Sequence, residues 1–431
     1  MTLLPPPRIA LAAIFRNEHP YVLEWIAHHR ALGVERFYIA DNISDDGTSE
    51  LLQALHDLGV IRRIAFASTP GQAPQLPAYA ELLGTHARDE DWIAVIDADE
   101  FTVPTGGARS LAEVLAPLAA QEDIGAVVLN WAIHGSAWLR NHSAGLVCER
   151  FTRRAHQEFG ANHHYKTVLR RAAFAAVHSN PHHFVLQPGW RCVHTDGSEV
   201  TPHARHGLGL SERVVWQGLR LNHYIVKSRE EFETRKARNG SAATVGRVKG
   251  TAYFEAHDRN DTGDRLPPWL LQATRLGMAA LVRALADAGH AVPEPNTEAP
   301  TYAAPFHGVQ GHIDRIEWRD GRLCLRGWAM HESGAAADRL HVQVGAHRWE
   351  IAAIDRCPRP DLKQHFPMAA EHCGFQLNLS DCNFPDRASW VQIQGAMAGQ
   401  APGGVFAVPD QALVRPDATA PCTIAAQEET Q

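Results

Sequence analysis

The run Ile-Ala-Leu-Ala-Ala-Ile-Phe at residues 9–15 decides the fold class of this chain, because it is apolar from end to end. A strand buried on both faces of a sheet has this pattern, whereas a strand with one wet face alternates. Similar short runs recur at 36–40, 61–66 and 92–96, and segments with helical spacing of apolar residues separate them. This alternation predicts an α/β domain with a mostly parallel sheet covered by helices on both faces.

The pattern changes after a proline-rich segment at 289–305, which predicts a linker. Short segments that alternate apolar and polar residues follow it, as is typical of an antiparallel β-sandwich. We therefore expect a first domain over 8–288, an all-β sandwich-like module over 306–415 and a disordered tail over 416–431. Within the first domain, further strands are predicted at 126–130 and 166–169, and further helices at 77–87, 111–120, 229–238 and 268–288.

The composition excludes several classes of function. The chain has 431 residues, of which 45% are apolar, and a formal net charge of -7. Proteins that follow nucleic-acid phosphates usually carry a basic surplus, so no nucleic-acid partner is expected. No apolar stretch reaches the length of a membrane span, and the proline-rich start lacks the basic segment of a signal peptide. The seven cysteines form no CxxC pair, so we expect a cytoplasmic protein with reduced thiols.

Three carboxylates, Asp97, Asp99 and Glu100, lie directly after the apolar run at 92–96. In an extended chain, Asp97 and Asp99 would point the same way. Two carboxylates held close together repel each other unless a cation neutralises them. Their hard oxygens suit Mg²⁺ or Mn²⁺, and such an ion would also bind a diphosphate. The alternative interpretation is an ordinary acidic turn after a strand.

Polar clusters also follow the first two apolar runs, with FRNE at 15–18 and DNISDDGT at 41–48. Taken singly, each is explained by a solvated loop or by a turn in which Thr48 or Ser49 caps the next helix. Taken together, they would meet in one crevice, because ligands of such sheets bind beyond the carboxyl ends of the strands. We expect a nucleoside site there.

These motifs resemble the opening of bacterial glycosyltransferase family 2-like and family 92-like enzymes. The resemblance covers most of residues 8–240 and implies the Rossmann-like GT-A fold with its DxD motif, a nucleotide-sugar donor, and Mn²⁺ or Mg²⁺ as cofactor. The matching segments are IFRNE at 14–18, LEWIAHH at 23–29, FYIADN at 37–42, DDGT at 45–48, WIAVIDADEF at 92–101, NW at 130–131, GS at 135–136, YKT at 165–167 and NHY at 222–224.

The resemblance implies a role for several residues by their position. The metal would be held by Asp97 and Asp99, with a downstream histidine as third ligand. Among the downstream histidines we favour His183 and His223 for this role, and a structural histidine is the alternative for each. Glu100 would hold the donor sugar or orient the site. Contacts to the donor nucleotide or its diphosphate would come from Arg16, Asn17, Glu18, Asp41, Asn42, Asp45, Asp97 and Lys166.

The catalytic base cannot be read from a motif. An inverting transferase needs a carboxylate within hydrogen-bond reach of the acceptor hydroxyl. Besides Glu100, the candidates are Glu158 and Asp196, and neither lies in a segment that matches the family.

The module at 306–415 is similar to a small β module that is appended to many bacterial glycosyltransferases. The similarity rests on GHID at 311–314, LCLRGWA at 323–329, RPDL at 359–362 and GFQL at 374–377. Four tryptophans, Trp318, Trp328, Trp349 and Trp390, could include a sugar-stacking platform, and core packing is the alternative.

The predicted activity is metal-dependent transfer of a hexose from a nucleoside diphosphate sugar, with a UDP-sugar favoured, to a hydroxyl of a glycan or lipid-linked glycan. We expect a role in surface polysaccharide biosynthesis, with transient contact to the inner membrane through the acceptor. One alternative is a nucleotidyl- or phosphotransferase, which the lack of a glycine-rich phosphate loop disfavours. Another is a non-catalytic carbohydrate-binding protein, which the intact Asp97 and Asp99 disfavour.

Overall fold

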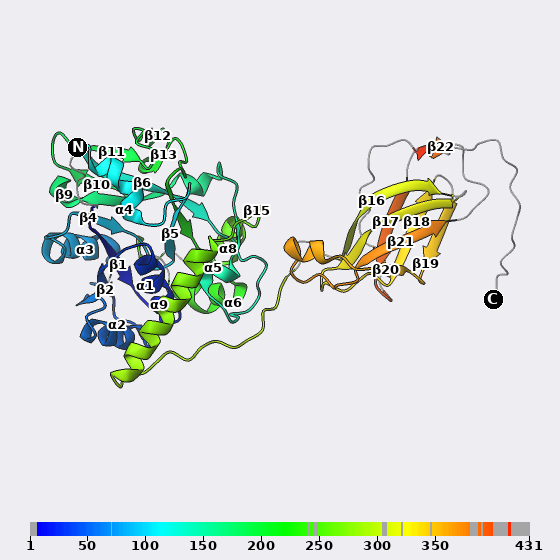
Figure 1. Cartoon of the computed structure of the whole chain (residues 1–431), viewed down its shortest axis with the longest axis horizontal. Coiled ribbons are helices and arrows are strands. Elements are labelled where there is room, and N and C mark those ends of the chain that lie inside the picture. The colour runs from blue at the N-terminus through cyan, green and yellow to red at the C-terminus, as the bar shows by residue number, and fades with distance from the viewer. Residues whose placement is uncertain are drawn as a thin grey trace, which may run out of the picture. The chain divides into compact units, whose positions relative to one another are not determined.

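The computed structural model describes residues 7–69, 71–239, 242–244, 246, 249–303, 308–319, 322–344, 347–379, 387–388, 391–399 and 413–414. The chain divides into two compact units, residues 1–300 and 301–431. The first unit is α/β and the second is all-β (Figure 1), which confirms the predicted fold class. The predicted tail at 416–431 lies outside the described residues, and so does Trp390.

The first unit is built on a nine-stranded sheet with the order β3-β2-β1-β4-β8-β6-β14-β5, in which β11 also pairs with β6. Only β8 and β5 run antiparallel to their neighbours, so the sheet is mostly parallel, as predicted. The strands are β1 (Ile9–Phe15), β2 (Arg36–Asp41), β3 (Arg62–Ala65), β4 (Trp92–Val95), β5 (Glu100–Pro104), β6 (Ile124–Ile133), β8 (Tyr165–Arg170), β11 (Arg191–His194) and β14 (Leu219–His223).

The strand that follows the acidic cluster, β5, was not predicted. It pairs antiparallel with β14, which places His223 opposite Glu100. The sequence signal is weak because the strand opens on a glutamate and ends on Pro104, although all five of its residues are buried. The consequence is that the acidic cluster lies in a tight connection between two strands of one sheet.

Helices pack around the sheet as the apolar spacing predicted. They are α1 (Val22–Ala31), α2 (Thr48–Asp57), α3 (Gln75–Glu81), α4 (Leu111–Ala119), α5 (Val147–Arg150), α6 (Arg229–Glu231), α7 (Ala237–Asn239), α8 (Thr251–His257) and α9 (Pro268–Asp287). Two π-helical segments, η1 (Leu82–His86) and η4 (Phe232–Lys236), extend α3 and join α6 to α7. The remaining short elements are β7 (Arg153–Arg154), β9 (Phe174–Val177), β10 (Phe184–Leu186), β12 (Pro202–His203), β13 (Gly207–Ser211), β15 (Thr262–Gly263), η2 (Gly160–His163) and η3 (Arg171–Ala173).

Local sequence signals predicted the end of α1 correctly but not the residue that caps α2. Gly33 has a φ of 87°, the left-handed conformation that ends α1 at the predicted place. The predicted cap of α2 is wrong, because the N-cap residue is Gly47 and makes no side-chain bond. Thr48 is instead the first helical residue, and its hydroxyl accepts a hydrogen bond from the backbone N–H of Glu18 at 2.9 Å. It thereby ties the ends of β1 and β2 together.

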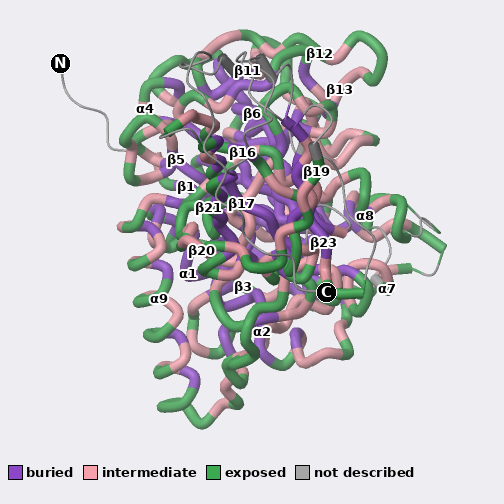
Figure 2. Tube along the Cα trace, turned by 90° about the vertical axis from the view of Figure 1, so that its right-hand side faces the viewer, coloured by how far each residue is buried: buried purple, intermediate pink, exposed green. Residues whose placement is uncertain are grey.

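The core follows from the apolar runs. One face of the sheet packs on α3 and η1 through Ile14, Ile93, Tyr79 and Leu83, all of which are buried. On α9, buried residues recur at 270, 274, 281 and 285, so one stripe of this helix is covered and the rest is half-buried or exposed (Figure 2). The helix packs on α1 so closely that a methyl group added at Gly277 would lie 3.1 Å from Cβ of Ala27.

A buried ion pair anchors the segment after β14. Arg150 donates to both carboxylate oxygens of Glu231, at 2.8 and 2.9 Å, and Tyr21 Oη donates to Glu231 Oε1 at 2.8 Å. The side chains of Arg150 and Glu231 are only 5% and 2% exposed. Burial raises the pKa of the Glu231 carboxyl, but the Arg150 guanidinium outweighs this effect and brings that pKa to about 2, below its ordinary 4.5.

Replacing Glu231 by glutamine should therefore lower the thermal unfolding midpoint at neutral pH, and this difference from the parent should shrink in acid. A depressed carboxyl pKa stabilises the fold above the unfolded value, and the stabilisation is lost as the pH falls through the folded value. Calorimetry from about pH 7 to about pH 3 measures how the difference in unfolding midpoint depends on pH. Glu233→Gln is the control, because Glu233 is 58% exposed and pairs with Arg229 on the surface. A difference that does not change with pH would contradict the prediction.

Two antiparallel sheets form the main part of the second unit that the structure describes, and β22 and β24 pair in a short third one. One of the two main sheets has the order β16-β17-β21-β20 and the other β19-β18-β23. A shared core that includes Leu325, Val342, Phe375 and Ile393 joins them. The strands are β16 (Val309–Arg319), β17 (Arg322–His331), β18 (Arg339–Val344), β19 (His347–Ile351), β20 (Asp355–Cys357), β21 (Gly374–Leu379) and β23 (Val391–Ala396), with η5 (Pro360–Gln364), β22 (Arg387–Ala388) and β24 (Leu413–Val414) beside them.

The described tryptophans of this unit pack inward. Trp318 and Trp349 contact the shared core, and Trp328 packs on Phe366. Among the helices that the structure describes, none combines the length and the apolar character that crossing a bilayer requires.

Candidate active site

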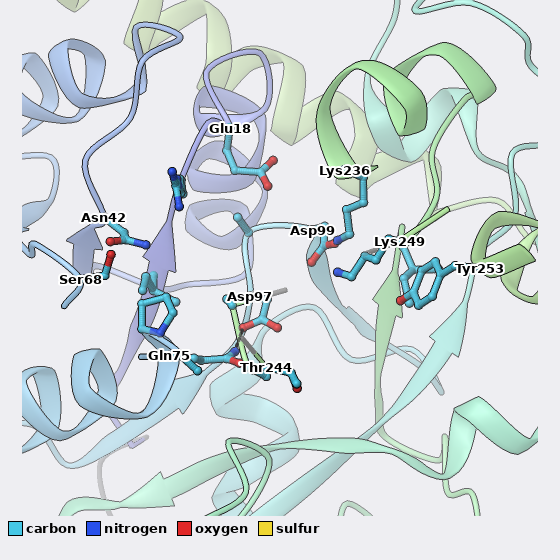
Figure 3. A pocket seen from close by; sticks show the side chains of 18 of the residues that line it. Glu18, Asn42, Ser68, Gln75, Asp97, Asp99, Lys236, Thr244, Lys249 and Tyr253 are labelled. Atoms are coloured by element: carbon cyan, nitrogen blue, oxygen red, sulfur yellow. Dashed lines mark hydrogen bonds and ion pairs between the residues drawn. The ribbon is translucent and has the colours of Figure 1, made fainter. Parts of the chain in front are cut away.

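A cavity of about 650 Å³ opens at the carboxyl ends of β1, β2 and β4. The three polar clusters predicted to meet there all contribute to its wall, through Arg16, Glu18, Asn42, Asp97 and Asp99. Figure 3 shows Asn42 and Ser68 on one side of the cavity, Asp97 and Gln75 in its floor, and Asp99, Lys236 and Tyr253 on the other side.

Asp97 is held by three donors that come from different elements. Its Oδ1 accepts hydrogen bonds from Lys166 Nζ on β8 and from Gln75 Nε2 and Tyr79 Oη on α3, each at 2.8 Å. Burial raises the pKa of the Asp97 carboxyl, but the Lys166 ammonium outweighs it and leaves that pKa below its usual range. Asp97 is therefore a fixed anion, and its side chain is 27% exposed and lines the cavity.

The backbone between the aspartates corrects the expectation of an extended chain. The N–H of Glu100 donates to the carbonyl of Asp97 at 3.1 Å, which closes a tight turn. The alternation of side chains along a strand does not apply inside a turn. Asp97 and Asp99 therefore pair with different lysines, although both line the same cavity.

Asp99 lies between a histidine and a lysine. Its Oδ2 is 3.5 Å from Nε2 of His223 and forms an ion pair with the ammonium of Lys236. Burial raises the pKa of the Asp99 carboxyl, but Lys236 and His223 hold that pKa well below its usual range. Burial lowers the pKa of His223, so its ring is neutral at pH 7 and can offer a lone pair.

Glu100 lies behind this pair and does not line the cavity. Its side chain is fully buried, and its Oε2 accepts the backbone N–H of Asp97 at 2.7 Å. Burial raises the pKa of Glu100 to about 8. Its position supports the turn that carries the aspartates, whereas a direct contact to the donor sugar would require the turn to open.

The predicted donor contacts separate into two groups. Arg16, Glu18 and Asn42 line the cavity. Asp41 does not, because its carboxylate accepts hydrogen bonds from Arg63 and Ser49 beneath the surface.

Asn17 and Asp45 also lie outside the main cavity. The side-chain oxygen of Asn17 accepts the backbone N–H of Asp45 at 3.0 Å, and Asn17 itself has a φ of 57°. This contact links the loops after β1 and β2. Asn17 and Asp45 therefore shape the wall of the site from behind.

The two acidic candidates for the base are not brought to the cavity. Glu158 is exposed in the turn before η2. Asp196 lies in the turn after β11, where it accepts hydrogen bonds from Ser198 and pairs with Arg213 at 3.4 Å. Among the described residues, the carboxylates that line the cavity are those of Glu18, Asp97 and Asp99.

Of the two favoured histidines, His223 lines the cavity and His183 does not. His183 turns away and contacts Tyr165 Oη at 3.1 Å, whereas its neighbour His182 faces the cavity. The backbone of a loop decides which of two adjacent side chains points inward, and the sequence offers no signal for that choice.

Aromatic and imidazole rings form the wall beyond Asp99. Trp131 on β6 stacks on His164 with ring centres 4.7 Å apart and an interplanar angle of 19°. The rings of His182 and His223 contact the edge of the same tryptophan. Burial lowers the pKa of His164 to about 4, so this wall carries no charge at pH 7.

The residues at hand fit a divalent cation with few protein ligands. In the described part of the chain, no three His, Cys, Asp or Glu side chains converge as a complete metal cage. Asp99 Oδ2 and His223 Nε2 nevertheless lie 3.5 Å apart. Neighbouring ligands of an octahedral ion with bonds of about 2.1 Å are roughly 3 Å apart, so this oxygen and this imidazole suit one Mn²⁺ or Mg²⁺. Such ions usually take their remaining ligands from phosphates and water.

Several residues of the site escaped the sequence analysis. Gln75 and Tyr79 lie four residues apart on α3, and polar residues at that spacing on a buried helix face are a signal that could have been used. Lys236 carries no comparable signal, because it lies in a predicted surface helix. Lys249 and Tyr253 also escaped it, and they join the wall from a later part of the chain.

The first part of the chain is similar in sequence to known proteins. Residues 9–136 match the sequence model described as glycosyltransferase family 92. A glycosyltransferase family 92 protein of Oryza sativa subsp. japonica is 27% identical over 188 residues, which cover 43% of this chain and 31% of that protein. One of Arabidopsis thaliana is 25% identical over 192 residues, 42% of this chain and 32% of that protein.

The matching region is thus glycosyltransferase family 92-like, as the resemblance implied. The chain spans about a third of the length of these curated relatives. Both relatives named here are plant proteins, so a bacterial origin stays a prediction.

Solved structures share little of the overall shape. Glucosyl-3-phosphoglycerate synthase from Mycobacterium tuberculosis, in complex with Mn²⁺, UDP and glucosyl-3-phosphoglycerate, is 18% identical with a TM-score of 0.21, over 29% of this chain and 44% of that one. S. aureus TarS is 11% identical with a TM-score of 0.28, over 94% and 77%. At these scores the likeness carries no argument about the site.

Proposed function

We propose that this protein is a glycosyltransferase that moves a hexose from a nucleoside diphosphate sugar to a hydroxyl group. The observation that carries the proposal is the charge pattern of one cavity. It presents Asp97 and Asp99 at the carboxyl end of β4, and basic side chains of Arg16, Lys236 and Lys249 around them. Carboxylates that can share a cation, ringed by positive groups, suit a diphosphate bound through a divalent ion.

The nucleoside would lie at the ends of β1, β2 and β3. Asn42 and Ser68 line this side of the cavity (Figure 3) and offer uncharged donors and acceptors for a base edge and ribose hydroxyls. Arg16 lies on the same wall and suits a phosphate. Parallel sheets bind their ligands at this edge, which supports the placement.

Asp99 and His223 would hold the cation, and Asp97 lines the same cavity. When bound, Mn²⁺ or Mg²⁺ supplies Lewis-acid stabilisation of the departing diphosphate. Lys166 and Tyr79 hold Asp97 in place, so the site is oriented before the donor arrives. Trp131 and His164 line the same cavity and would shield one side of the donor sugar from water.

The acceptor would lie on the uncharged wall. The Nδ1–H of His164 donates to the carbonyl of Ala161 at 3.1 Å, and that of His182 donates to the carbonyl of Tyr165 at 2.9 Å. Each ring then presents Nε2 as an acceptor. Flat rings with acceptor atoms suit the faces and hydroxyls of a sugar.

Replacing His164 by alanine is expected to raise the KM for the acceptor about tenfold without changing the affinity for UDP. The change removes one hydrogen-bond acceptor and a stacking surface, together worth roughly 1–2 kcal/mol. Acceptor kinetics and UDP titration of the same preparation measure the two effects. His163→Ala is the matched control, because His163 does not line the cavity and contacts the carbonyl of Ser211. Weaker UDP binding with an unchanged acceptor KM would contradict the assignment.

The finer features of the activity rest on the sequence resemblance. They are a UDP-sugar as donor, a glycan or lipid-linked glycan as acceptor, a role in surface polysaccharide biosynthesis, and contact with the inner membrane through the acceptor. The cytoplasmic location is proposed instead from the cysteines, which form no CxxC pair. None of the proposed bases Glu100, Glu158 and Asp196 lines the cavity, so the cavity itself favours none of them for this role.

Incubation with a panel of UDP- and GDP-sugars, in Mn²⁺ or in EDTA, tests the proposal. Metal-dependent release of UDP or GDP is the expected result. Release of pyrophosphate would instead support a nucleotidyltransferase. Binding of a sugar without turnover of any donor would support a non-catalytic carbohydrate-binding protein.

A further inference from the structure

Each aspartate of the site has its own lysine, and the two lysines differ. Lys166 belongs to β8, in the middle of the sheet, and its side chain is fully buried. Lys236 belongs to the π-helical segment η4, and its side chain is 21% exposed and lines the cavity. Lys166 thus has no open space beside it, whereas Lys236 lies at the cavity.

Lys236 contacts one of the two side chains that could bind a cation. Its ammonium contacts Asp99 Oδ2, the same oxygen that lies 3.5 Å from Nε2 of His223. Two positive groups cannot share this oxygen without strong repulsion, because unit charges a few ångströms apart interact by several kcal/mol at the effective dielectric of a protein. A divalent ion between Asp99 and His223 requires the ammonium to move.

The local backbone suits such a movement. A π-helical turn is rare and is often found at functional sites, because it aims a side chain that a regular helix would not. Lys236 is the last residue of this turn, and the segment after it, including Thr244 and Lys249, lines the same cavity. Lys236 therefore reaches Asp99 from a short helical segment at the rim of the cavity and is not part of the sheet.

We propose that Lys236 is an exchangeable counterion: its ammonium neutralises Asp99 when no divalent cation is bound, and it turns to the diphosphate of the donor when one is. This inference rests on the proposed function, because it assumes a diphosphate beside Asp99. The exchange makes cation and nucleotide binding cooperative. The ammonium opposes binding of the cation when no nucleotide is bound, but it stabilises the complex of the cation with the diphosphate. Such coupling is reciprocal between the two ligands.

Titration of Mn²⁺, followed by electron paramagnetic resonance of the free ion, tests the inference on the full-length protein without substrate turnover. In the absence of UDP, Lys236→Met should bind Mn²⁺ at least about tenfold more tightly than the parent, a change of about 1.4 kcal/mol. At saturating Mn²⁺, the same variant should bind UDP at least about tenfold more weakly. Lys236→Arg should stay near the parent in both titrations, because it keeps the charge.

Arg235→Met is the matched control. It removes one positive charge from the same turn, but Arg235 pairs with Asp46 at 2.9 Å and does not line the main cavity. We expect this variant to bind Mn²⁺ and UDP as the parent does. Lys236→Gln, which keeps a polar chain, serves as the second test should the methionine variant not fold.

The outcomes separate the inference from the proposed function. Unchanged or weaker Mn²⁺ binding by Lys236→Met without UDP overturns the counterion exchange alone. Absence of Mn²⁺ binding in the parent and in every variant, with and without UDP, overturns the proposed metal site as well.

Discussion

Replacing Asp99 by asparagine is expected to lower metal-dependent release of nucleoside diphosphate from the donor at least about 100-fold while the protein stays folded. The substitution keeps the size of the side chain and removes its negative charge. Oδ2 of Asp99 lies 3.5 Å from Nε2 of His223 and contacts the ammonium of Lys236. Asp99 is therefore the carboxylate that we expect to bind the cation in the cavity. An uncharged amide attracts the ion only weakly and does not compensate for the water molecules that the ion loses on binding.

Initial rates across a range of Mn²⁺ concentrations measure this effect, and circular dichroism verifies the fold. Asp196→Asn is the control, because Asp196 was a candidate from the sequence but lies in a turn with Ser198 and Arg213, away from the cavity. It should leave the rate close to that of the parent. A rate near the parent's for Asp99→Asn would mean that the cation is held elsewhere.

Replacing Lys166 by methionine is expected to destabilise the first unit by about 3–5 kcal/mol, the usual effect of breaking one side of a buried ion pair. The ammonium lies 2.8 Å from Asp97 and 3.9 Å from Glu100, with Tyr79 Oη at 3.5 Å. Burial lowers the pKa of Lys166, but the two carboxyls outweigh it and raise that pKa above its ordinary value. Without this charge, the Asp97 carboxylate loses its counterion at the edge of the core.

Hydrogen exchange of peptides from β4 and β8, measured at increasing urea concentration, reports the free energy of unfolding of this region and avoids averaging over the two units. The double variant Lys166→Met/Asp97→Asn should regain much of the lost stability, because it removes the uncompensated carboxylate. Arg8→Met, which breaks an exposed pair with Asp91 beside β4, should have a much smaller effect. An effect of Lys166→Met as small as that of Arg8→Met would show that Lys166 is not the counterion of this cluster.

Part of the site was predictable from local sequence because strand ends carry it. Asp97, Asp99, Arg16, Glu18 and Asn42 follow buried strands, and parallel pairing of β1 with β2 and β4 brings those ends to one edge. The same reasoning predicted Asp41 in the cavity, and the resemblance predicted His183 there, but neither side chain lines it. Their neighbours decide where these side chains point, as Arg63 does for Asp41 and Tyr165 for His183.

The apolar runs and their spacing by themselves determined the α/β class, the positions of most elements, the change to antiparallel strands after the linker, and the edge of the sheet at which the site lies. These features depend on which faces of a segment must be buried, and that information is local. Only the tertiary structure decided how the aspartates are neutralised, with Lys166 against Asp97 and Lys236 against Asp99. Counterions are chosen by proximity in space, and the residues concerned lie between 69 and 137 positions from their partners, too far for any local pattern to specify.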